Sequence, residues 1–370
     1  MRPLDELELL LRPAAGGLYV VSTGRAGQLA VQRRIYGGDG ENEVAARWKE
    51  ALRRIPAARV LLLGIPSDVG AGLLRGANMG PQAIRSRMVD EDPEWFARAA
   101  AKGVVDVGDV FVVPQLLHDD MLSDGQREAS RRALYPAVPG AERARLPVSP
   151  LSIAERALEL LAALAPGAAP FLLGGDHSCA WPAAKVLAAS RPGLGIVQID
   201  AHTDLLEERL GVRYCFGTWS YHANELLGRG GRLVQVGVRA SRHERAHWEA
   251  KFGVRQLWAG EVKADPAAAL DAVVAALRLA GVERVYFSND IDGTDESFAR
   301  ATGTPEPEGL DAEFVVALIR RLGRDVGLAG GDVMEVAPPL AHGDGEPERT
   351  LALASRYARE TIEAILAEKV

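Results

Sequence analysis

Two carboxylates and an imidazole follow one apolar run of the chain at alternate positions. Asp200, His202 and Asp204 come directly after residues 195–199, whose composition is typical of a buried parallel strand. At an extended strand end, positions i, i+2 and i+4 point to the same side, so these side chains converge. Mixed imidazole and carboxylate ligands suit divalent ions such as Mn, Fe, Zn or Ni. The alternative is that the aspartates cap the next helix and His202 is a hydrogen-bonded buried histidine.

Two further strand ends carry the same residue types. His177 follows the apolar run 170–173 and a two-glycine turn, and another pair of aspartates follows the apolar run 284–288. The potential ligands are then His177, Asp200, His202, Asp204, Asp290 and Asp292. Six exceed the need of one divalent ion but fit two ions that share bridging carboxylates and activate one water. Each motif alone is compatible with a capped strand end, whereas the three together favour a metal centre.

The elements that must position these side chains alternate along the chain. Apolar runs predict strands at 59–66, 104–113, 170–173, 195–199, 233–238, 284–288 and 328–336. Helices are predicted between them, for example at 181–189, 264–279, 311–322 and 349–368. This alternation predicts an α/β fold with three α/β/α layers and a central, mainly parallel sheet. The ligands would lie at the carboxyl ends of its strands, where such sheets bind ligands.

Other segments are predicted to have structural roles. We interpret residues 1–57 as an N-terminal extension packed on a single main domain, 58–370. Ser152 is expected to begin a helix, with Glu155 completing a capping box. Residues 114–150 are polar, and we expect the His-Asp-Asp run at 118–120 to be exposed to solvent.

Composition excludes several classes of protein. The 370 residues are 48% hydrophobic and 25% charged, as in globular proteins, and the net charge of -7 with no basic stripe argues against nucleic-acid binding. No apolar run is long enough to span a membrane. Cys179 and Cys215 are too few for a disulfide framework, and the acidic N-terminal residues differ from a signal peptide. We therefore expect a cytoplasmic protein.

The strand-end motifs resemble a known family. Residues 174–178 (Gly-Gly-Asp-His-Ser), 200–204 (Asp-Ala-His-Thr-Asp) and 288–292 (Ser-Asn-Asp-Ile-Asp) look like the three metal motifs of the ureohydrolases. That family includes arginase, agmatinase, formiminoglutamase and guanidino-acid hydrolases. Supporting matches lie at 75–85, 106–109 and 335–338, so the resemblance covers the chain from about residue 59. Residues 302–307 (Thr-Gly-Thr-Pro-Glu-Pro) and the Pro338-Pro339 pair are most similar to the agmatinase branch.

The resemblance implies a role for each matching residue. It implies one manganese ion on His177, Asp200, Asp204 and Asp290, and a second on Asp200, His202, Asp290 and Asp292. A metal-bridging hydroxide would attack the guanidinium or amidine carbon, with Asp204 as its hydrogen-bonding partner. Glu335 would hold the guanidinium, and the products would be an amine and urea. The resemblance also implies a homo-oligomer, either a trimer or a hexamer.

One loop departs from the agmatinase pattern. Where agmatinases have His-Gly-Thr, this chain has Phe216, Gly217 and Thr218, and we predict that Phe216 and Thr218 contact the substrate. Phenylalanine cannot carry a proton, so another group must do so if the reaction requires it. His222 is the predicted candidate, with Cys215 and Tyr221 as others. The alternative is that His222 only packs on its helix.

The sequence leaves the small-molecule substrate open. In the same loop, Glu207 and Glu208 would suit a cationic substrate tail such as that of agmatine, whereas Arg209 and Arg213 would suit a carboxylate. The leading hypothesis is a manganese hydrolase of agmatine or a related guanidino compound. The alternatives are a formiminoglutamase-type amidine hydrolase and a metal-binding member of the family without catalytic activity.

Overall fold

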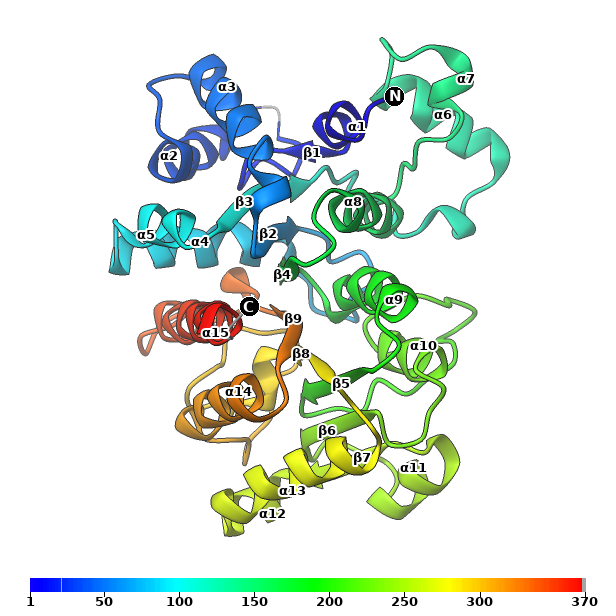
Figure 1. Cartoon of the computed structure of the whole chain (residues 1–370), viewed down its shortest axis with the longest axis vertical. Helices are drawn as coiled ribbons and strands as arrows, with labels where there is room; N and C mark the ends of the chain where they lie inside the picture. Colours follow the sequence, from blue (N-terminus) through cyan, green and yellow to red (C-terminus); the bar gives the residue numbers. More distant parts are fainter. Residues whose placement is uncertain (21, 368–370) are drawn as a thin grey trace.

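A nine-stranded sheet runs through the computed structural model, which describes residues 1–20 and 22–367 (Figure 1). Neighbouring strands are parallel, except that the edge strand β1 is antiparallel to β3. In their order across the sheet the strands are β1 (Leu11–Arg12), β3 (Val104–Val110), β2 (Val60–Ile65), β4 (Ala169–Gly174), β9 (Leu328–Val333), β8 (Arg284–Asn289), β5 (Leu194–Ile199), β6 (Leu233–Val238) and β7 (Arg255–Trp258). The predicted α/β fold with a mainly parallel sheet is confirmed.

Helices cover both faces of this sheet (Figure 1). Along β2, Leu61 and Leu63 belong to one buried apolar cluster and Val60 and Leu62 to the other, because alternate side chains point to opposite faces. The first face is covered by α8 (Pro150–Leu164), α9 (Trp181–Ser190) and α10 (Trp219–Leu226). The second face is covered by α4 (Gly80–Glu91), α13 (Pro266–Leu279), α14 (Ala312–Asp325) and α15 (Glu348–Ala367). The result is the predicted three-layer arrangement.

Further α-helices pack around these layers. They are α1 (Pro3–Leu10), α2 (Arg25–Tyr36), α3 (Glu41–Leu52), α5 (Trp95–Ala101), α6 (Asp124–Leu134), α7 (Gly140–Arg143), α11 (Arg245–Phe252) and α12 (Ala259–Ala264). Of all the helices in the described residues, none has the length and apolar character to cross a bilayer.

The N-terminal segment packs against one end of the sheet. β1 extends the sheet by pairing with β3, and α1 packs on α8. Leu7 and Leu10 of α1 are fully buried, and Trp48 of α3 donates a hydrogen bond from Nε1 to Val107 O at 2.9 Å. The predicted boundary after residue 57 stays a prediction.

Two sequence-based expectations are wrong. α8 begins at Pro150 with Ser149 at its N-cap, so Glu155 does not complete a capping box at Ser152. Instead, Glu155 accepts hydrogen bonds from Trp181 Nε1 at 2.8 Å and Lys185 Nζ at 2.6 Å. His118 is only 4% exposed, because its ring packs on Tyr214 and its Nε2 lies 3.3 Å from Glu155. Residues distant in sequence therefore bury a histidine that was expected to be exposed.

Candidate metal centre

The carboxyl ends of four neighbouring strands meet at one place. β4, β9, β8 and β5 are adjacent in the sheet. His177 follows β4, Glu335 follows β9, Asp290 and Asp292 follow β8, and Asp200 to Asp204 follow β5. Adjacent parallel strands bring these side chains together, as expected at the carboxyl edge of an open α/β sheet.

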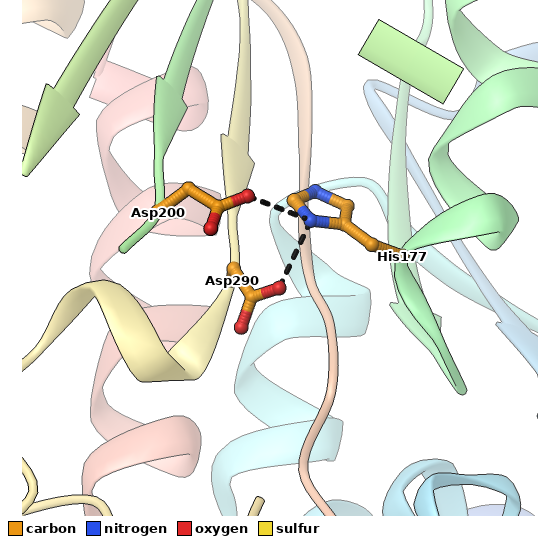
Figure 2. A group of neighbouring side chains, drawn as sticks. All are labelled: His177, Asp200 and Asp290. Carbon is orange, nitrogen blue, oxygen red and sulfur yellow. Dashed lines mark ion pairs between the residues drawn. The ribbon is translucent and has the colours of Figure 1, made fainter. Parts of the chain in front are cut away.

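Six side chains form two groups that share one carboxylate. In the first group, His177 forms ion pairs with Asp200 and Asp290 (Figure 2). Its Nδ1 lies 3.2 Å from Asp200 Oδ2 and 3.0 Å from Asp290 Oδ2. Asp204 Oδ2 lies 3.4 Å from the same nitrogen. In the second group, His202 Nδ1 lies 3.4 Å from Asp200 Oδ1 and 3.2 Å from Asp292 Oδ2. The two oxygens of Asp200 therefore face different imidazoles, which is the geometry of a bridging ligand.

The imidazole of His177 is held in place through Nε2, the ring nitrogen that does not face the carboxylates. Its Nε2 lies 3.0 Å from Ser288 Oγ, which in turn donates to Asp332 Oδ2 at 2.9 Å. Asp332 is fully buried in β9 and also accepts a hydrogen bond from Asn289 N. This chain turns Nδ1 of His177 toward the carboxylates, and such outer contacts orient histidines that bind metals.

Asp200 is held by a row of glutamines across three strands. Gln198, Gln235 and Gln256 are register partners on β5, β6 and β7. Gln198 Nε2 donates to Asp200 Oδ2 at 2.7 Å, Gln235 Nε2 to Gln198 Oε1 at 2.8 Å, and Gln256 Nε2 to Gln235 Oε1 at 2.8 Å. Each amide is oriented by the next, so the row fixes Asp200 through buried hydrogen bonds.

Asp204 and Glu335 have unusual backbone conformations. Their φ angles are +50° and +61°, a left-handed region that is costly for residues other than glycine. Trp219 Nε1 donates to Asp204 Oδ2 at 3.1 Å, and His177 N donates to Glu335 Oε1 at 2.9 Å. Oε2 of Glu335 makes no hydrogen bond within the described part of the chain and faces Gly303. Such strain is concentrated at functional sites.

The cluster has no lysine or arginine partner among the described residues. Burial raises the pKa of Asp290 well above its usual value, and the neighbouring Asp292 and Asp200 raise it further. Burial acts to lower the pKa of His202, but Asp292 and Asp200 outweigh it and raise that pKa to about 12. Without a metal ion, some of the cluster's six side chains must therefore be protonated, which limits the repulsion between the carboxylates.

These residues fit divalent metal ions. His177 Nδ1 is buried without a hydrogen bond, although three carboxylate oxygens lie within 3.4 Å of it. Buried polar atoms normally have partners, so an orphaned nitrogen facing carboxylates indicates a missing ligand. His177, Asp200 and Asp290 offer donor atoms within 4.8 Å of one another, and so do Asp200, His202 and Asp292. These donors are the imidazoles and carboxylates that such ions bind.

Comparison with known proteins agrees with this geometry. A model of the arginase family matches residues 58–363. The chain belongs to the arginase family. This membership confirms the predicted resemblance to ureohydrolases and the predicted enzyme class, a hydrolase acting on linear amidines.

Several relatives in the arginase family are similar over most of their length. The chain is 31% identical to a guanidinobutyrase of Pseudomonas aeruginosa over 293 residues, covering 77% of this chain and 81% of the relative. It is also 31% identical to a mitochondrial agmatinase of Gallus gallus over 295 residues, covering 75% and 73%. The solved structure of proclavaminate amidino hydrolase from Streptomyces clavuligerus superposes with a TM-score of 0.64 at 29% identity, covering 84% and 94%.

The loop that departs from the agmatinase pattern lies beside this centre. Phe216 is half-buried, and its ring would contact a side chain added at Gly72. Thr218 is fully buried, and its hydroxyl bonds within its own loop to Arg213 O at 2.7 Å. His222 Nε2 also faces Arg213 O, at 3.0 Å, and its ring packs on Tyr214 and Tyr221. None of the hydrogen bonds and ring contacts recorded for His222 in the described residues involves a metal ligand.

Several residues that support the candidate ligands could hardly be recognised from the sequence. Ser288, Asp332, Gln198 and Trp219 hold ligands but were not predicted to do so. A charged residue inside an apolar strand, as Asp332 is in β9, was the available signal. Thr304 is a further case, because its Oγ1 donates to Asp292 Oδ2 at 2.8 Å.

Proposed function

We propose that this chain is a manganese-dependent hydrolase that cleaves a C–N bond of a guanidino compound. The guanidinium and one water would give a protonated amine and urea, with atoms and charge conserved. The observation that carries the proposal is the pair of ligand groups sharing Asp200, with the unpartnered Nδ1 of His177 between carboxylates. Imidazole and carboxylate donors without a thiolate suit manganese, as they also suit iron, zinc and nickel. The resemblance to ureohydrolases is the reason to propose manganese.

The side chains would divide the work between them. His177, Asp200, Asp204 and Asp290 would hold one ion, and Asp200, His202, Asp290 and Asp292 the other. When bound, two such ions make water acidic enough to react as hydroxide near neutral pH. Glu335 would accept hydrogen bonds from the guanidinium through its unoccupied Oε2.

Two side chains are candidates for transferring the proton, Asp204 and His222. Asp204 would take the proton of the attacking water and pass it to the leaving amine. Proton transfer by His222, and substrate contact by Phe216 and Thr218, stay predictions. The direction in which His222 faces favours Asp204 as the main carrier.

The substrate is proposed by its chemical class. The relatives named guanidinobutyrase and agmatinase support a guanidino substrate, with a tail that is either acidic or basic. A formimino substrate is the second candidate, because a formimidoylglutamase from Bacillus subtilis shares the fold at a TM-score of 0.65. Homo-oligomeric assembly and a cytoplasmic location stay predictions.

The test is urea release by manganese-loaded protein. The panel contains agmatine, arginine, 4-guanidinobutyrate, 3-guanidinopropionate and free guanidine, and formamide is followed for formiminoglutamate. Asp204→Asn should abolish release. The control Asp311→Asn should not, because Asp311 caps α14 and asparagine caps a helix equally well. Urea from none of the guanidino compounds would refute the proposal, and formamide alone would favour the second candidate.

A further inference from the structure

An open cavity lies beside the metal centre. Its volume is about 470 Å³, and we call it the tail cavity. Its lining includes Gly70, Arg75, Leu117, Met121, Arg209 and Phe216. The lining leucines and Met121 would pack on methylene groups of a bound molecule. The charged side chains in the lining are both arginines. No aspartate or glutamate in the described residues lines it.

Neither arginine has an acidic partner among the described residues. The guanidinium of Arg209 lies 4.7 Å from the ring centroid of Phe216, which supports it as a cation–π platform. Arg75 donates to the carbonyl oxygens of Asp68 at 2.9 Å and Val69 at 3.3 Å. No ion pair in the described ranges involves either guanidinium, so both retain donors for an incoming anion.

The sequence does not show which charged residues of the 205–218 loop would face a substrate, whereas the structure does. Of Glu207, Glu208, Arg209 and Arg213, only Arg209 lines the tail cavity. The guanidinium of Arg213 lies over Tyr214 instead, 5.1 Å from its centroid. The charge facing the cavity from this loop is therefore positive.

Gly70 links the tail cavity to the segment that carries the candidate ligand His177. Gly70 N donates to Asp176 Oδ2 at 3.0 Å, and Asp176 precedes the ligand His177. Phe216 N donates to Gly70 O at 3.1 Å, so the aromatic platform is tied to the same segment. At the other end of this segment, Leu74 O faces Gly303, which also faces Glu335 Oε2. Residues 69–75 thus run from the metal centre to the guanidinium-binding carboxylate.

We propose that the substrate is a guanidino carboxylate, whose carboxylate is held in the tail cavity by Arg209 and Arg75. This inference rests on the proposed function, because Glu335 and the metal centre must take the guanidinium end. Arginine is suited to this role, since its planar donors match the two oxygens of a carboxylate. Phe216 then supports Arg209 at the position where agmatinases have a histidine. A cationic tail, as in agmatine, would be repelled from the same cavity.

The test compares two substrates of similar length and opposite tail charge, 4-guanidinobutyrate and agmatine. With manganese-loaded wild-type protein, kcat/KM for 4-guanidinobutyrate should exceed that for agmatine. Arg209→Met should lower kcat/KM for 4-guanidinobutyrate about 10- to 100-fold, as expected for losing a hydrogen bond to a charged group. The same variant should not lower kcat/KM for agmatine. Arg213→Met is the matched control, and it should change neither value by more than about twofold.

A binding measurement separates the two proposals. The amine products 4-aminobutyrate and 1,4-diaminobutane are titrated calorimetrically into the wild type and Arg209→Met, which requires no turnover. Tighter binding of 4-aminobutyrate that depends on Arg209 supports the tail cavity. Urea release with agmatine preferred, or equal losses for both substrates in Arg209→Met, would overturn the tail assignment alone. No urea from any guanidino compound, together with Arg209-dependent binding of 4-aminobutyrate, would overturn the proposed hydrolysis and keep the carboxylate site.

Discussion

Two clusters of buried carboxylates in this molecule differ in the source of their positive charge. At one end of the sheet, fully buried Arg85 donates from Nε to Asp106 Oδ2 at 2.9 Å and from Nη1 to Asp109 Oδ1 at 2.6 Å. At the metal centre, four aspartates surround two histidines without any such arginine. The first cluster is completed by the chain itself. The second would be completed by cations from solution under the proposed function.

The largest effect is expected from removing the shared ligand. Asp200→Asn should lower urea release at least about 1,000-fold, because metal ions contribute several kcal/mol to the transition state and each tenfold corresponds to about 1.4 kcal/mol. Metal content by elemental analysis should fall in parallel. The melting temperature of the metal-free variant should stay close to that of the metal-free wild type, because the lost attraction to His177 and His202 is offset by the lost repulsion from Asp290. A large drop in that temperature would show that Asp200 is structural.

The opposite result is expected at the cluster of Arg85, Asp106 and Asp109. Arg85→Met should lower the free energy of unfolding by about 3–5 kcal/mol, because two buried carboxylates lose their partner. Chemical denaturation of metal-free protein provides the measurement. Adding Asp106→Asn and Asp109→Asn should recover part of the loss, whereas a loss below about 1 kcal/mol for Arg85→Met would remove the contrast between the clusters.

A smaller effect is expected from the glutamine row. Gln198→Leu removes the amide that donates to Asp200 Oδ2 and should weaken metal binding about 10- to 100-fold, the usual range for residues that orient ligands. Competition with a metal chelator measures this. Gln256→Leu, two amides further from the ligand, should have a weaker effect. Equal effects of the two variants would mean that the row acts only on stability.

The smallest effect concerns Glu155, another carboxylate with partners from the chain. Burial acts to raise its pKa, but hydrogen bonds from His118 and Lys185 outweigh this and lower the pKa below its usual value. A lowered folded-state pKa stabilises the protein above the unfolded-state value of about 4.3, and this stabilisation is lost as pH falls through the folded-state pKa. Glu155→Gln should therefore cost about 1 kcal/mol at pH 7 and progressively less below about pH 4.

The matched control for this pH dependence is Glu159→Gln, one turn further along α8. Glu159 is exposed and pairs only with Arg156 among the described residues, so its replacement should cost less than about 0.5 kcal/mol. Thermal melts of both variants between pH 3 and 7 provide the comparison. A stability difference for Glu155→Gln that grows in acid would contradict the assigned direction of the pKa.

The strand ends could be predicted because their signal is local. Apolar runs such as 195–199 end directly at Asp200, and the two-residue spacing to His202 and Asp204 follows from strand geometry. The parallel sheet then brings separate strand ends together, so a cluster of six candidate ligands could be predicted without knowledge of the strand order.

Contacts between distant segments could not be predicted. Gln198, Gln235 and Gln256 look like isolated polar residues in apolar strands until the register aligns them. The charges of the 205–218 loop gave opposite indications because sequence does not say which side chain faces a cavity. His118 was expected to be exposed, since its cover comes from Tyr214, almost a hundred positions later.

Metal binding by the metal-free protein would show whether the cluster is completed by cations. Metal-free wild type is titrated with manganese, and bound metal is counted while the melting temperature is followed. We expect two ions per chain and a rising melting temperature, because a ligand that binds only the folded state stabilises it by about 2.7 kcal/mol at 100 times its Kd. Asp311→Asn should behave like the wild type. Failure to bind manganese or any other divalent ion, with the fold intact, would contradict the claim that this cluster is completed by metal.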